Sequence, residues 1–553
     1  MEKIPSFNQY IEDSVIKFWD KDAFTDYKGA TLQYHDVARK IEKLHIMFEN
    51  SGVKRGDKIA LCGRNSSHWA VAFLATLTYG AIAVPVQNEF TPEQIHNIVN
   101  HSESKLLFVG DVVCTQVNPD MMPALEGIVY LPDFSIVISR SEQLTFAREH
   151  LNEIFGKRYP KFFRKEHIHY YKEQSPEELA MINYTSGTTG FSKGVMLPYR
   201  ALWGNIDYVL KCLTPNVKPG SNLVSILPMA HMYGLAVEFL FGFINGCHLY
   251  FLNRMPSPSL IAEAFAEVKP RLIVAVPLVV EKIIRRKVLA EVQTNRMKLL
   301  LNMPVINKKI KQHIRDRIME AFGGNAYEII VGGAPLNQGI EEFLNSVGVP
   351  ITIGYGTTET APLITFANYD KYKIASCGPA VEHMEVKVVS PDPANVPGEL
   401  IAKGMNVMLG YYKNEEATNA VLDKDGWFHT GDLATMAPSG HIYIKGRIKN
   451  MLLGANGQNV YPEEIEDKLN NMPLVGESII IQRDTKLIAL VHPEIEDKEA
   501  MDFDDDDVKG IMDENLKTLN NQLPPFCKIA AIEIQKEEFQ KTAKKSIKRY
   551  LYK

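Results

Sequence analysis

Short apolar runs alternate with helical patterns near the start of the chain, and this alternation constrains the fold most strongly. Residues 58–62, 81–86 and 105–109 have the length and composition of buried strands, and residues 67–79 have the pattern of a helix. Thr91-Pro-Glu-Gln94 is a capping box that opens a further helix. Strands that alternate with helices in this way predict a parallel sheet with helices on both faces.

Length and composition indicate a large globular protein with more than one domain. At 553 residues the chain is too long for one ordinary core, and its 45% hydrophobic and 23% charged residues are typical of a soluble protein. The net charge of −5 gives no electrostatic reason to expect a nucleic acid partner. We therefore expect an α/β protein that does not bind nucleic acid.

The sequence pattern shows neither a targeting signal nor a spanning helix. The six cysteines lack a paired spacing for zinc or for a disulfide framework, which indicates reduced thiols. Residues 1–5 lack the apolar core of a signal peptide, and the apolar runs 70–86 and 235–252 are both interrupted before about 20 residues. We expect a cytoplasmic protein. Peripheral membrane contact, and the choice between monomer and homodimer, stay open.

The run Tyr184-Thr-Ser-Gly-Thr-Thr-Gly-Phe-Ser-Lys-Gly194 is the strongest candidate for a binding site. Its glycines let main-chain N–H groups approach an anion closely, its hydroxyls are donors, and Lys193 adds a positive charge. Composition alone favours a surface turn, and the spacing is not that of the P-loop. The density of small donors around one lysine fits a polyphosphate.

The full string resembles the signature of the adenylate-forming (AMP-binding) enzymes, which include acyl-CoA synthetases, luciferases and the adenylation domains of peptide synthetases. Only Ser192 departs from the commonest form, in which a proline precedes the lysine. The resemblance runs from about residue 10 to the C-terminus, with the motifs in the family's order. It implies that the phosphates of ATP are bound by Thr185, Ser186, Gly187, Thr188, Thr189, Gly190 and Lys193.

Two later loops extend the resemblance to the rest of the nucleotide. Gly332-Gly-Ala-Pro-Leu336 and Gly354-Tyr-Gly-Thr-Thr-Glu-Thr-Ala-Pro362 each follow an apolar run, and in a doubly wound sheet such loops lie where ligands bind. Taken singly, each is more often an ordinary turn. The resemblance assigns adenine, phosphate or Mg²⁺ binding to Gly333, Ala334, Pro335, Tyr355, Gly356, Thr357, Thr358 and Glu359. Glu359 and Thr185 are the candidate Mg²⁺ ligands, since Mg²⁺ prefers oxygen.

Three further residues are candidates for the sugar and the acid. His231 follows a strand-like run, and on residue type alone a buried structural histidine fits it as well as a place beside a carboxylate substrate. The family's acyl pocket has a similar segment, which favours the functional interpretation. By resemblance Asp432 holds the ribose hydroxyls, and Arg447 contacts the same sugar or the phosphate. A Gly-Asp dipeptide is otherwise a turn.

The resemblance also predicts the domain organisation. Lys449 occupies the family's hinge position, so we expect a large α/β domain at 1–449, with doubly wound, mostly parallel sheets, and a small mobile α+β domain at 450–553. Family members place a lysine near the C-terminus that reaches the adenylate, but an ungapped alignment puts Ser546 in that slot. Lys545 and Lys548 are the neighbouring candidates, and a plain basic tail is the alternative.

The activity implied by the resemblance is the ATP-dependent conversion of a carboxylic acid to acyl-AMP, followed by transfer to coenzyme A. Lys193, Thr358 and Glu359 would act on the phosphates, and Mg²⁺ would be the metal. The C-terminal residues resemble long-chain fatty acyl-CoA synthetases most, although an aryl or medium-chain acid stays open. A carrier-protein acceptor, a luciferase-like oxygenase and a non-catalytic nucleotide-binding protein are the rival functions.

Two segments have patterns without a functional assignment. Residues 115–175 have few long apolar repeats, which predicts an irregular connection. Residues 502–507 include five aspartates, which predicts a solvated loop. We claim no function for either segment.

Overall fold

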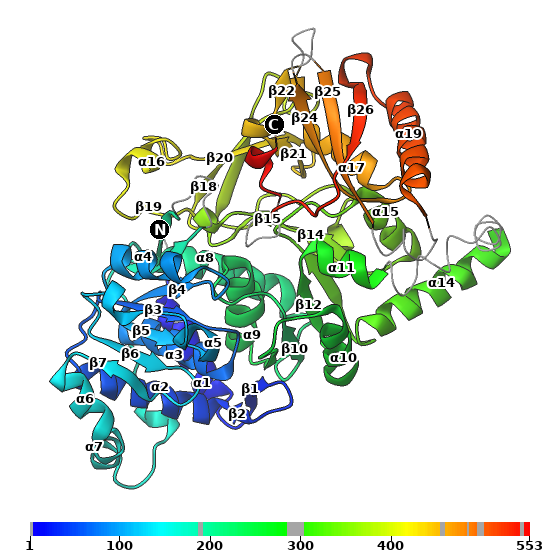
Figure 1. The fold of residues 1–553 in the computed structure, drawn as a ribbon. Coiled ribbons are helices and arrows are strands. Elements are labelled where there is room, and N and C mark those ends of the chain that lie inside the picture. The colour runs from blue at the N-terminus through cyan, green and yellow to red at the C-terminus, as the bar shows by residue number, and fades with distance from the viewer. Residues whose placement is uncertain are drawn as a thin grey trace.

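The computed structural model describes residues 4–185, 192–284, 304–453, 459–483, 486–494, 503–541 and 547–552. These residues form two large, mostly parallel sheets, a smaller antiparallel sheet and a separate unit at the C-terminal end (Figure 1). Within the described residues, none of the helices combines the length and the apolar character needed to span a bilayer.

The first large sheet has eight strands in the order β19-β9-β8-β4-β3-β5-β6-β7. The strands are β3 (Lys58–Cys62), β4 (Ile82–Val86), β5 (Ser104–Val109), β6 (Gly127–Tyr130), β7 (Ile136–Ser139), β8 (Leu179–Tyr184), β9 (Gly194–Pro198) and β19 (Gly410–Tyr411). The inner strands are parallel, whereas β7, β9 and β19 run antiparallel to their neighbours at the two edges. β3 and α3 (Ser67–Tyr79) have the bounds that the sequence predicts.

The second large sheet has seven strands in the order β14-β13-β12-β10-β11-β1-β2. The strands are β1 (Asp22–Asp26), β2 (Thr31–Gln33), β10 (Asn222–Ser225), β11 (His248–Phe251), β12 (Leu272–Ala275), β13 (Glu328–Val331) and β14 (Ile351–Ile353). Every pair is parallel except β1 with β2. α10 (Pro258–Val268) and α15 (Gln338–Val347) pack on the strands of this sheet, and α11 (Pro277–Ile284) and α14 (Pro304–Ala321) contact α10, whereas α8 (Tyr199–Leu213) contacts β9 of the first sheet.

The main core lies between the two large sheets and is built around α3. This helix is buried on nearly every side, as expected of a helix that is apolar all round and contacts both sheets. Trp69 stacks on Phe73 with the ring centroids 5.4 Å apart, and Phe239 packs edge-on against both rings. The core therefore holds the two sheets in one fixed relation.

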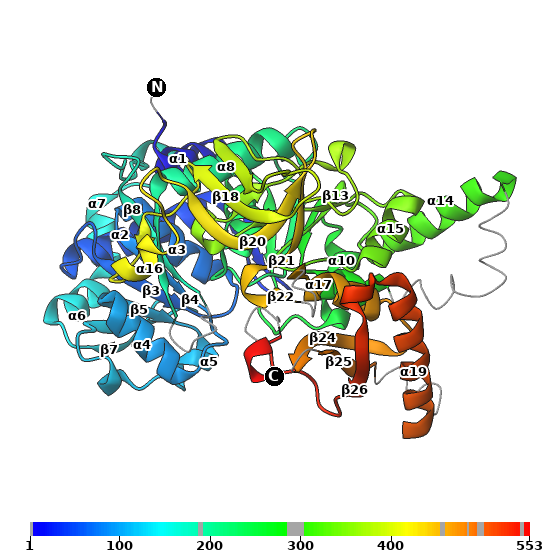
Figure 2. The ribbon, with the colours of Figure 1, turned by 90° about the horizontal axis from the view of Figure 1, so that it is seen from above.

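Two smaller units follow the large sheets. An antiparallel sheet contains β17 (Met384–Val389), β18 (Gly398–Gly404), β20 (Phe428–Met436) and β21 (Ile442–Arg447). The C-terminal unit contains β24 (Val475–Arg483), β25 (Lys486–Pro493), β26 (Ile529–Ile534), α17 (Pro462–Asn470) and α19 (Asp505–Gln522). It has an apolar core of its own and lies at one side of the large sheets, with α17 against β21 (Figures 1 and 2). The predicted α/β fold with a smaller C-terminal domain is confirmed.

The prediction that residues 115–175 form an irregular connection is wrong. The segment contributes β6 and β7 to the edge of the first sheet, followed by α6 (Glu142–Glu149) and α7 (Leu151–Arg158). Each strand has four residues and each helix eight, so the apolar pattern is too short to show a period. β6 joins the sheet by pairing with β5, and β7 forms the edge by pairing with β6; the local sequence does not encode these partners.

The prediction of a solvated loop at 502–507 is also wrong for the aspartates that the structure describes. Asp505, Asp506 and Asp507 form the first turn of α19, and Asp504 is its N-cap. Asp504 Oδ1 accepts hydrogen bonds from the backbone N–H groups of Asp506 and Asp507, both at 2.9 Å. Negative side chains at this end complement the exposed N–H groups of a helix. Asp502 lies outside the described residues.

Candidate active site

Loops from both large sheets meet beyond the carboxyl ends of their strands. Asn183, at the end of β8, donates from its side-chain amide to the carbonyl of Ala230 in the loop after β10, at 3.0 Å. Tyr233 of that loop donates from its hydroxyl to the carbonyl of Ile330 in β13, at 3.1 Å. Gly354 N, after β14, donates to Val331 O at 3.0 Å. These bonds bring together the loops in which the sequence places the candidate residues.

The loop after β13 approaches Tyr233 closely and then opens to the surface. A Cβ atom on Gly332 would lie 3.0 Å from Tyr233 Cζ, so a larger residue would displace the ring. Gly333 has φ +85°, a conformation that side chains with a Cβ rarely adopt. Gly333, Ala334 and Pro335 are exposed, so this strip of backbone is accessible to a ligand.

Tyr355, Asp432 and Arg447 form a polar cluster in which Asp432 is buried, Tyr355 is half-buried and Arg447 is exposed. Tyr355 Oη donates to Asp432 Oδ2 at 2.6 Å, and Arg447 Nε lies 2.7 Å from Asp432 Oδ1. Asp432 and Arg447 are direct partners across β20 and β21, which fixes this geometry. Burial raises the pKa of Asp432, while Arg447 and the hydrogen bond from Tyr355 oppose the rise. Each carboxylate oxygen has a second lone pair, so Asp432 can still accept hydrogen bonds from the hydroxyl groups of a ligand.

The segment after Tyr355 is held tightly against its own continuation. A Cβ atom on Gly356 would lie 1.8 Å from Pro362 O, a distance that real atoms do not reach. Thr357 N donates to the same carbonyl at 2.9 Å. Thr358 begins a single 3₁₀ turn and is buried, whereas Glu359 is half-buried. The turn therefore places the Thr358 and Glu359 backbone rigidly beside Tyr355.

Lys193 and Glu359 lie on either side of Tyr411, a residue that the sequence argument missed. Lys193 Nζ lies 4.7 Å from the centroid of the Tyr411 ring, and the Tyr411 hydroxyl donates to Glu359 Oε1 at 2.9 Å. β19 carries Tyr411 beside β9 because Tyr411 pairs with Val195. No local motif marks this tyrosine, since its partners are distant in the chain. Asn183 did offer a signal, because it is a polar residue in an otherwise apolar strand.

The residues present fit a hydrated divalent cation near Glu359. The carboxylate is half-buried and keeps Oε2 without a hydrogen bond to any other described residue. Thr185, the second candidate ligand, is half-buried at the base of the loop, where its N–H donates to Lys193 O at 3.0 Å. Hard oxygen donors of this kind suit Mg²⁺. Ser186, Gly187, Thr188, Thr189 and Gly190 lie outside the described residues.

His231 and the C-terminal lysines are placed less centrally. His231 lies in the loop after β10 and is half-buried, and its Nδ1 accepts from Tyr233 N at 3.3 Å. Lys548 N donates to Gln540 O at 2.8 Å. In the described part of the chain, the Lys548 side chain makes no hydrogen bond or ion pair with another candidate residue. Lys545 lies outside the described residues.

The predicted hinge position, Lys449, lies in a short 3₁₀ turn between β21 and the C-terminal unit. Beside it, the Asn450 side-chain amide donates to Glu463 Oε1 of α17 at 2.6 Å. Gly446 faces the same glutamate, since a Cβ atom there would lie 2.6 Å from Glu463 Oε2. A second contact joins α15 to α17, because Gln338 N donates to Asp467 Oδ1 at 3.3 Å.

Comparison with known proteins relates the chain to enzymes that activate acids. The chain is 30% identical over 507 residues to the long-chain-fatty-acid–CoA ligase of Escherichia coli O6:H1, covering 86% of this chain and 82% of that one. It is 24% identical over 515 residues to the human long-chain-fatty-acid–CoA ligase ACSBG2, covering 87% and 75%.

Solved structures share the fold at lower identity. ATP-bound MatB from Rhodopseudomonas palustris has a TM-score of 0.76 at 23% identity, with 99% of this chain and 98% of that one covered. The anthranilate CoA ligase AuaEII in complex with anthranoyl-AMP has a TM-score of 0.79 at 18% identity, with 99% and 97% covered. Residues 11–412 match the family model of AMP-binding enzymes, and residues 449–552 match that of the AMP-binding enzyme C-terminal domain. The chain therefore belongs to the AMP-binding enzyme family.

Proposed function

We propose that this protein is an AMP-forming acid–CoA ligase that activates a long-chain fatty acid. The observation that carries the proposal is the grouping of Tyr355, Asp432 and Arg447 in one cluster, with Lys193 and Glu359 joined through Tyr411 on neighbouring loops. The first cluster offers hydrogen-bonding groups to a nucleoside. The second offers a cation and a metal-binding carboxylate to its phosphates. A nucleoside triphosphate needs both.

In the first half-reaction the substrate carboxylate attacks the α-phosphorus of ATP. An oxygen–phosphorus bond forms, and the bond to the leaving pyrophosphate breaks. Lys193 would stabilise the charge that develops on the phosphate oxygens, and Thr358 would donate from its hydroxyl. Glu359 and Thr185 would hold Mg²⁺, which neutralises phosphate charge. Tyr355 would contact adenine, and Asp432 and Arg447 would hold the ribose.

In the second half-reaction the thiol of coenzyme A attacks the carbonyl carbon of the acyl-AMP. A thioester bond forms, AMP leaves, and the thiol proton is released. We place the boundary between the domains at 449/450 and propose that the C-terminal domain turns about Lys449 between the two steps. In the first step Lys545 or Lys548 would face the adenylate. Closure of such a domain completes a site and excludes water.

Two long-chain ligases among the relatives support the choice of acid. The aryl alternative has support of its own, because the solved neighbours include an anthranilate CoA ligase. Transfer to a carrier-protein pantetheine uses the same nucleotide chemistry and is the rival for the acceptor. His231 is our candidate for a residue beside the substrate carboxylate.

Pyrophosphate release from ATP across a panel of acids, from acetate to oleate plus benzoate, tests the proposal. We expect release to peak with the long chains and thioester to form only when coenzyme A is added. Release with thioester missing would point to a carrier protein. A maximum with benzoate or with a medium chain would replace the proposed acid, and no release with any acid would overturn the ligase.

Variants then test the residues. We expect Lys193→Ala and Glu359→Ala to lose at least about a hundredfold in the rate of pyrophosphate release, since each removes a charge that acts on the transition state. The matched controls Lys218→Ala and Glu385→Ala remove the same charges at exposed positions and should keep the rate. Unchanged rates for the first pair would refute the site while leaving the ligase reaction in place.

A further inference from the structure

Residues 157–167, which we call the basic loop, comprise the last two residues of α7 and the segment after it, and have an unusual composition for this chain. The sequence Lys-Arg-Tyr-Pro-Lys-Phe-Phe-Arg-Lys-Glu-His contains five lysine or arginine side chains and one carboxylate, although the whole chain has a net charge of −5. Figures 1 and 2 show α7 at the edge of the molecule, on the side away from the C-terminal unit. A concentrated positive charge therefore lies at one end of an acidic protein.

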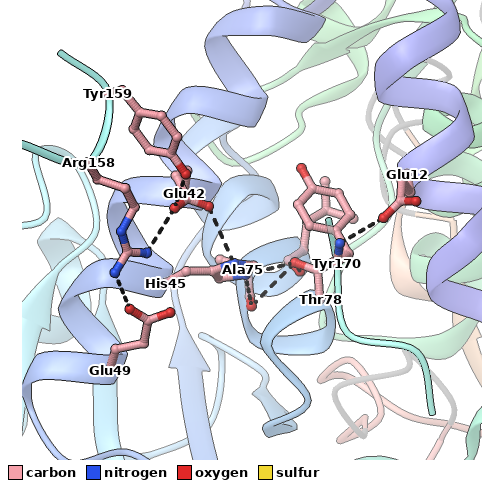
Figure 3. A network of polar contacts seen from close by, with 10 residues as sticks. Glu12, Glu42, His45, Glu49, Ala75, Thr78, Arg158, Tyr159 and Tyr170 are labelled. Atoms are coloured by element: carbon pink, nitrogen blue, oxygen red, sulfur yellow. Dashed lines mark hydrogen bonds and ion pairs between the residues drawn. The ribbon is translucent and has the colours of Figure 1, made fainter. Parts of the chain in front are cut away.

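The beginning of the basic loop is held against α2 (Tyr34–Asn50) by two carboxylates of that helix, of which Glu42 is half-buried and Glu49 exposed. Arg158 pairs with Glu49 at 2.6 Å and with Glu42 at 3.2 Å, and Tyr159 Oη donates to Glu42 Oε1 at 2.7 Å. Figure 3 shows these contacts, and also the Tyr170 N–H donating to Glu12 of α1 (Phe7–Lys17) at 2.7 Å. The segment is thus held by α2 at residues 158–159 and by α1 at Tyr170, which restricts the positions of the residues between them.

The two adjacent phenylalanines of the basic loop face opposite environments. Phe163 packs among aromatic rings, with its centroid 4.9 Å from that of Tyr159 and 6.1 Å from that of Trp19. Phe162 is 70% exposed, the largest value for any large apolar side chain in the described residues. Exposing a phenylalanine to water is unfavourable, so an anchored loop that presents one is suited to an apolar partner.

Exposed cationic residues flank Phe162 in the sequence. Lys161, Arg164 and Lys165 are exposed, and no ion pair joins them to an acidic group within the described ranges. The Arg164 guanidinium lies 6.0 Å from the centroid of the Phe162 ring. Lys157 is neutralised in part by Glu153 at 2.5 Å, and Arg158 is occupied by Glu42 and Glu49. Three unpaired cations and one exposed aromatic ring therefore form the outer surface.

We propose that the basic loop is a docking surface for an anionic phospholipid bilayer. Cationic side chains are attracted to anionic headgroups, and an aromatic ring between them is suited to the boundary between headgroups and acyl chains. The proposed docking surface needs both the cations and the exposed aromatic ring. As far as the structure describes it, the basic helix α14 has the first of these without the second. Lys308, Lys309 and Lys311 lie on a helix that extends from the body, but its described side chains include no exposed large apolar group (Figures 1 and 2). The proposal does not depend on which acid the enzyme activates.

Sedimentation of the full-length protein with vesicles tests the proposal. We expect binding to vesicles of phosphatidylcholine mixed with phosphatidylglycerol, weak binding to phosphatidylcholine alone, and loss of binding as salt is raised. The triple variant Lys161→Glu, Arg164→Glu, Lys165→Glu should lower the partition coefficient by at least about tenfold. Phe162→Ser should lower it several-fold and leave the salt dependence unchanged, since it removes the apolar contact alone.

The control is the triple variant Lys308→Glu, Lys309→Glu, Lys311→Glu, which changes the net charge by the same amount on α14. It should bind the anionic vesicles as the unmodified protein does. Equal losses from both triple variants would mean that overall charge, and not the basic loop, governs binding. Unchanged binding in the basic-loop variant, or no binding by the unmodified protein, would overturn the proposal.

Two further readouts complete the test. Binding to heparin or polyglutamate but not to vesicles, insensitive to Phe162→Ser, would assign the basic loop to an acidic macromolecule and overturn the lipid surface. Thermal unfolding of each variant should match the unmodified protein, because the altered side chains are exposed or, for Lys311, half-buried at the surface of α14. A variant that unfolds early is replaced by its alanine version.

Discussion

Tyr355 Oη lies 2.6 Å from Asp432 Oδ2, although 77 positions separate the two residues in the chain. The hydrogen bond joins the segment after β14 of the second large sheet to β20 of the antiparallel sheet. Arg447 approaches the other carboxylate oxygen at 2.7 Å. These two contacts make the candidate nucleoside site a connected polar network.

The first prediction concerns the pH dependence of nucleotide binding. Burial raises the pKa of Asp432, and the hydrogen bond from Tyr355 partly opposes this. If the ribose is held by the ionised carboxylate, ATP affinity should begin to fall on acidification at a pH above the ordinary aspartate pKa of about 3.9. Tyr355→Phe removes the opposing hydrogen bond, so the fall should begin at a still higher pH.

A fluorescent ATP analogue titrated at a series of pH values measures this effect. Tyr369→Phe is the control, because Tyr369 lies in a separate 3₁₀ turn outside the cluster. Parallel curves for Tyr355→Phe and the unmodified protein would show that Asp432 does not titrate in the binding step.

The second prediction separates the two contacts of Tyr411. Tyr411→Phe removes the hydrogen bond to Glu359 and keeps the ring beneath Lys193, whereas Tyr411→Leu removes both. We expect Tyr411→Phe to reduce the effect of Mg²⁺ on ATP binding and to weaken the binding free energy of ATP by about 1 kcal/mol. Tyr411→Leu should weaken that binding free energy by about 1 kcal/mol more. Calorimetric titration of ATP with and without Mg²⁺ measures both changes.

A double-mutant cycle with Glu359→Gln checks the assignment to that carboxylate. If Tyr411 acts through Glu359, the two substitutions should not be additive. Additive losses would show that the tyrosine merely supports the fold of the sheet edge.

The third prediction concerns the tight turn at Gly356. Gly356→Ala places a Cβ atom 1.8 Å from Pro362 O, so the backbone must move and carry Tyr355 and Thr357 with it. We expect a loss of about 1–3 kcal/mol in the free energy of unfolding and at least a tenfold weaker affinity for ATP. Urea unfolding and ATP titration measure the two effects. Gly510→Ala is the control, since a Cβ there meets nothing within 4 Å.

The fourth prediction concerns stability in mild acid. His45 is buried against α3, where Nε2 lies 3.1 Å from Ala75 O and 3.0 Å from Thr78 Oγ1, and burial lowers its pKa to about 4 (Figure 3). The unfolded chain binds this proton near pH 6.5 and the folded chain only near pH 4, so the stabilisation by the neutral ring is lost as pH falls between these values.

The loss from this one group should be about 1 kcal/mol between pH 7.5 and pH 5.5. Urea unfolding at the two pH values measures it. His45→Gln should show a pH dependence smaller by that amount, and His169→Gln, at an exposed position, should match the unmodified protein. An equal pH dependence in His45→Gln would assign the acid sensitivity to other groups.

Local patterns predicted much of the fold, because β3 and α3 are continuous apolar runs of the length expected for a buried strand and a buried helix. Elements that depend on a distant partner were missed. β6 and β7 are four residues long, and they are defined by the pairing of β6 with β5 and of β7 with β6. The aspartates of α19 have the charge pattern of a solvated loop, but Asp504 is a strong N-cap residue and begins a helix.

The candidate site shows the same division. Glu359, Asp432 and Arg447 were named from motifs, and the structure places Asp432 and Arg447 in one cluster. Their roles stay predictions. Tyr411 had no motif to mark it, since its significance comes from the pairing of β19 with β9. The position of Lys193 over its ring required coordinates.

That same pairing has a consequence for synthesis on the ribosome. β9 is complete at Pro198, but its outer neighbour β19 emerges about 200 residues later. Likewise β1 is synthesised long before β11, the strand that pairs with its inner edge. At about 5–20 residues per second, the edge of β9 would stay uncovered for roughly 10–40 seconds, and an uncovered edge invites pairing with another chain. Slow translation of this stretch therefore lengthens the period in which the nascent chain needs a chaperone.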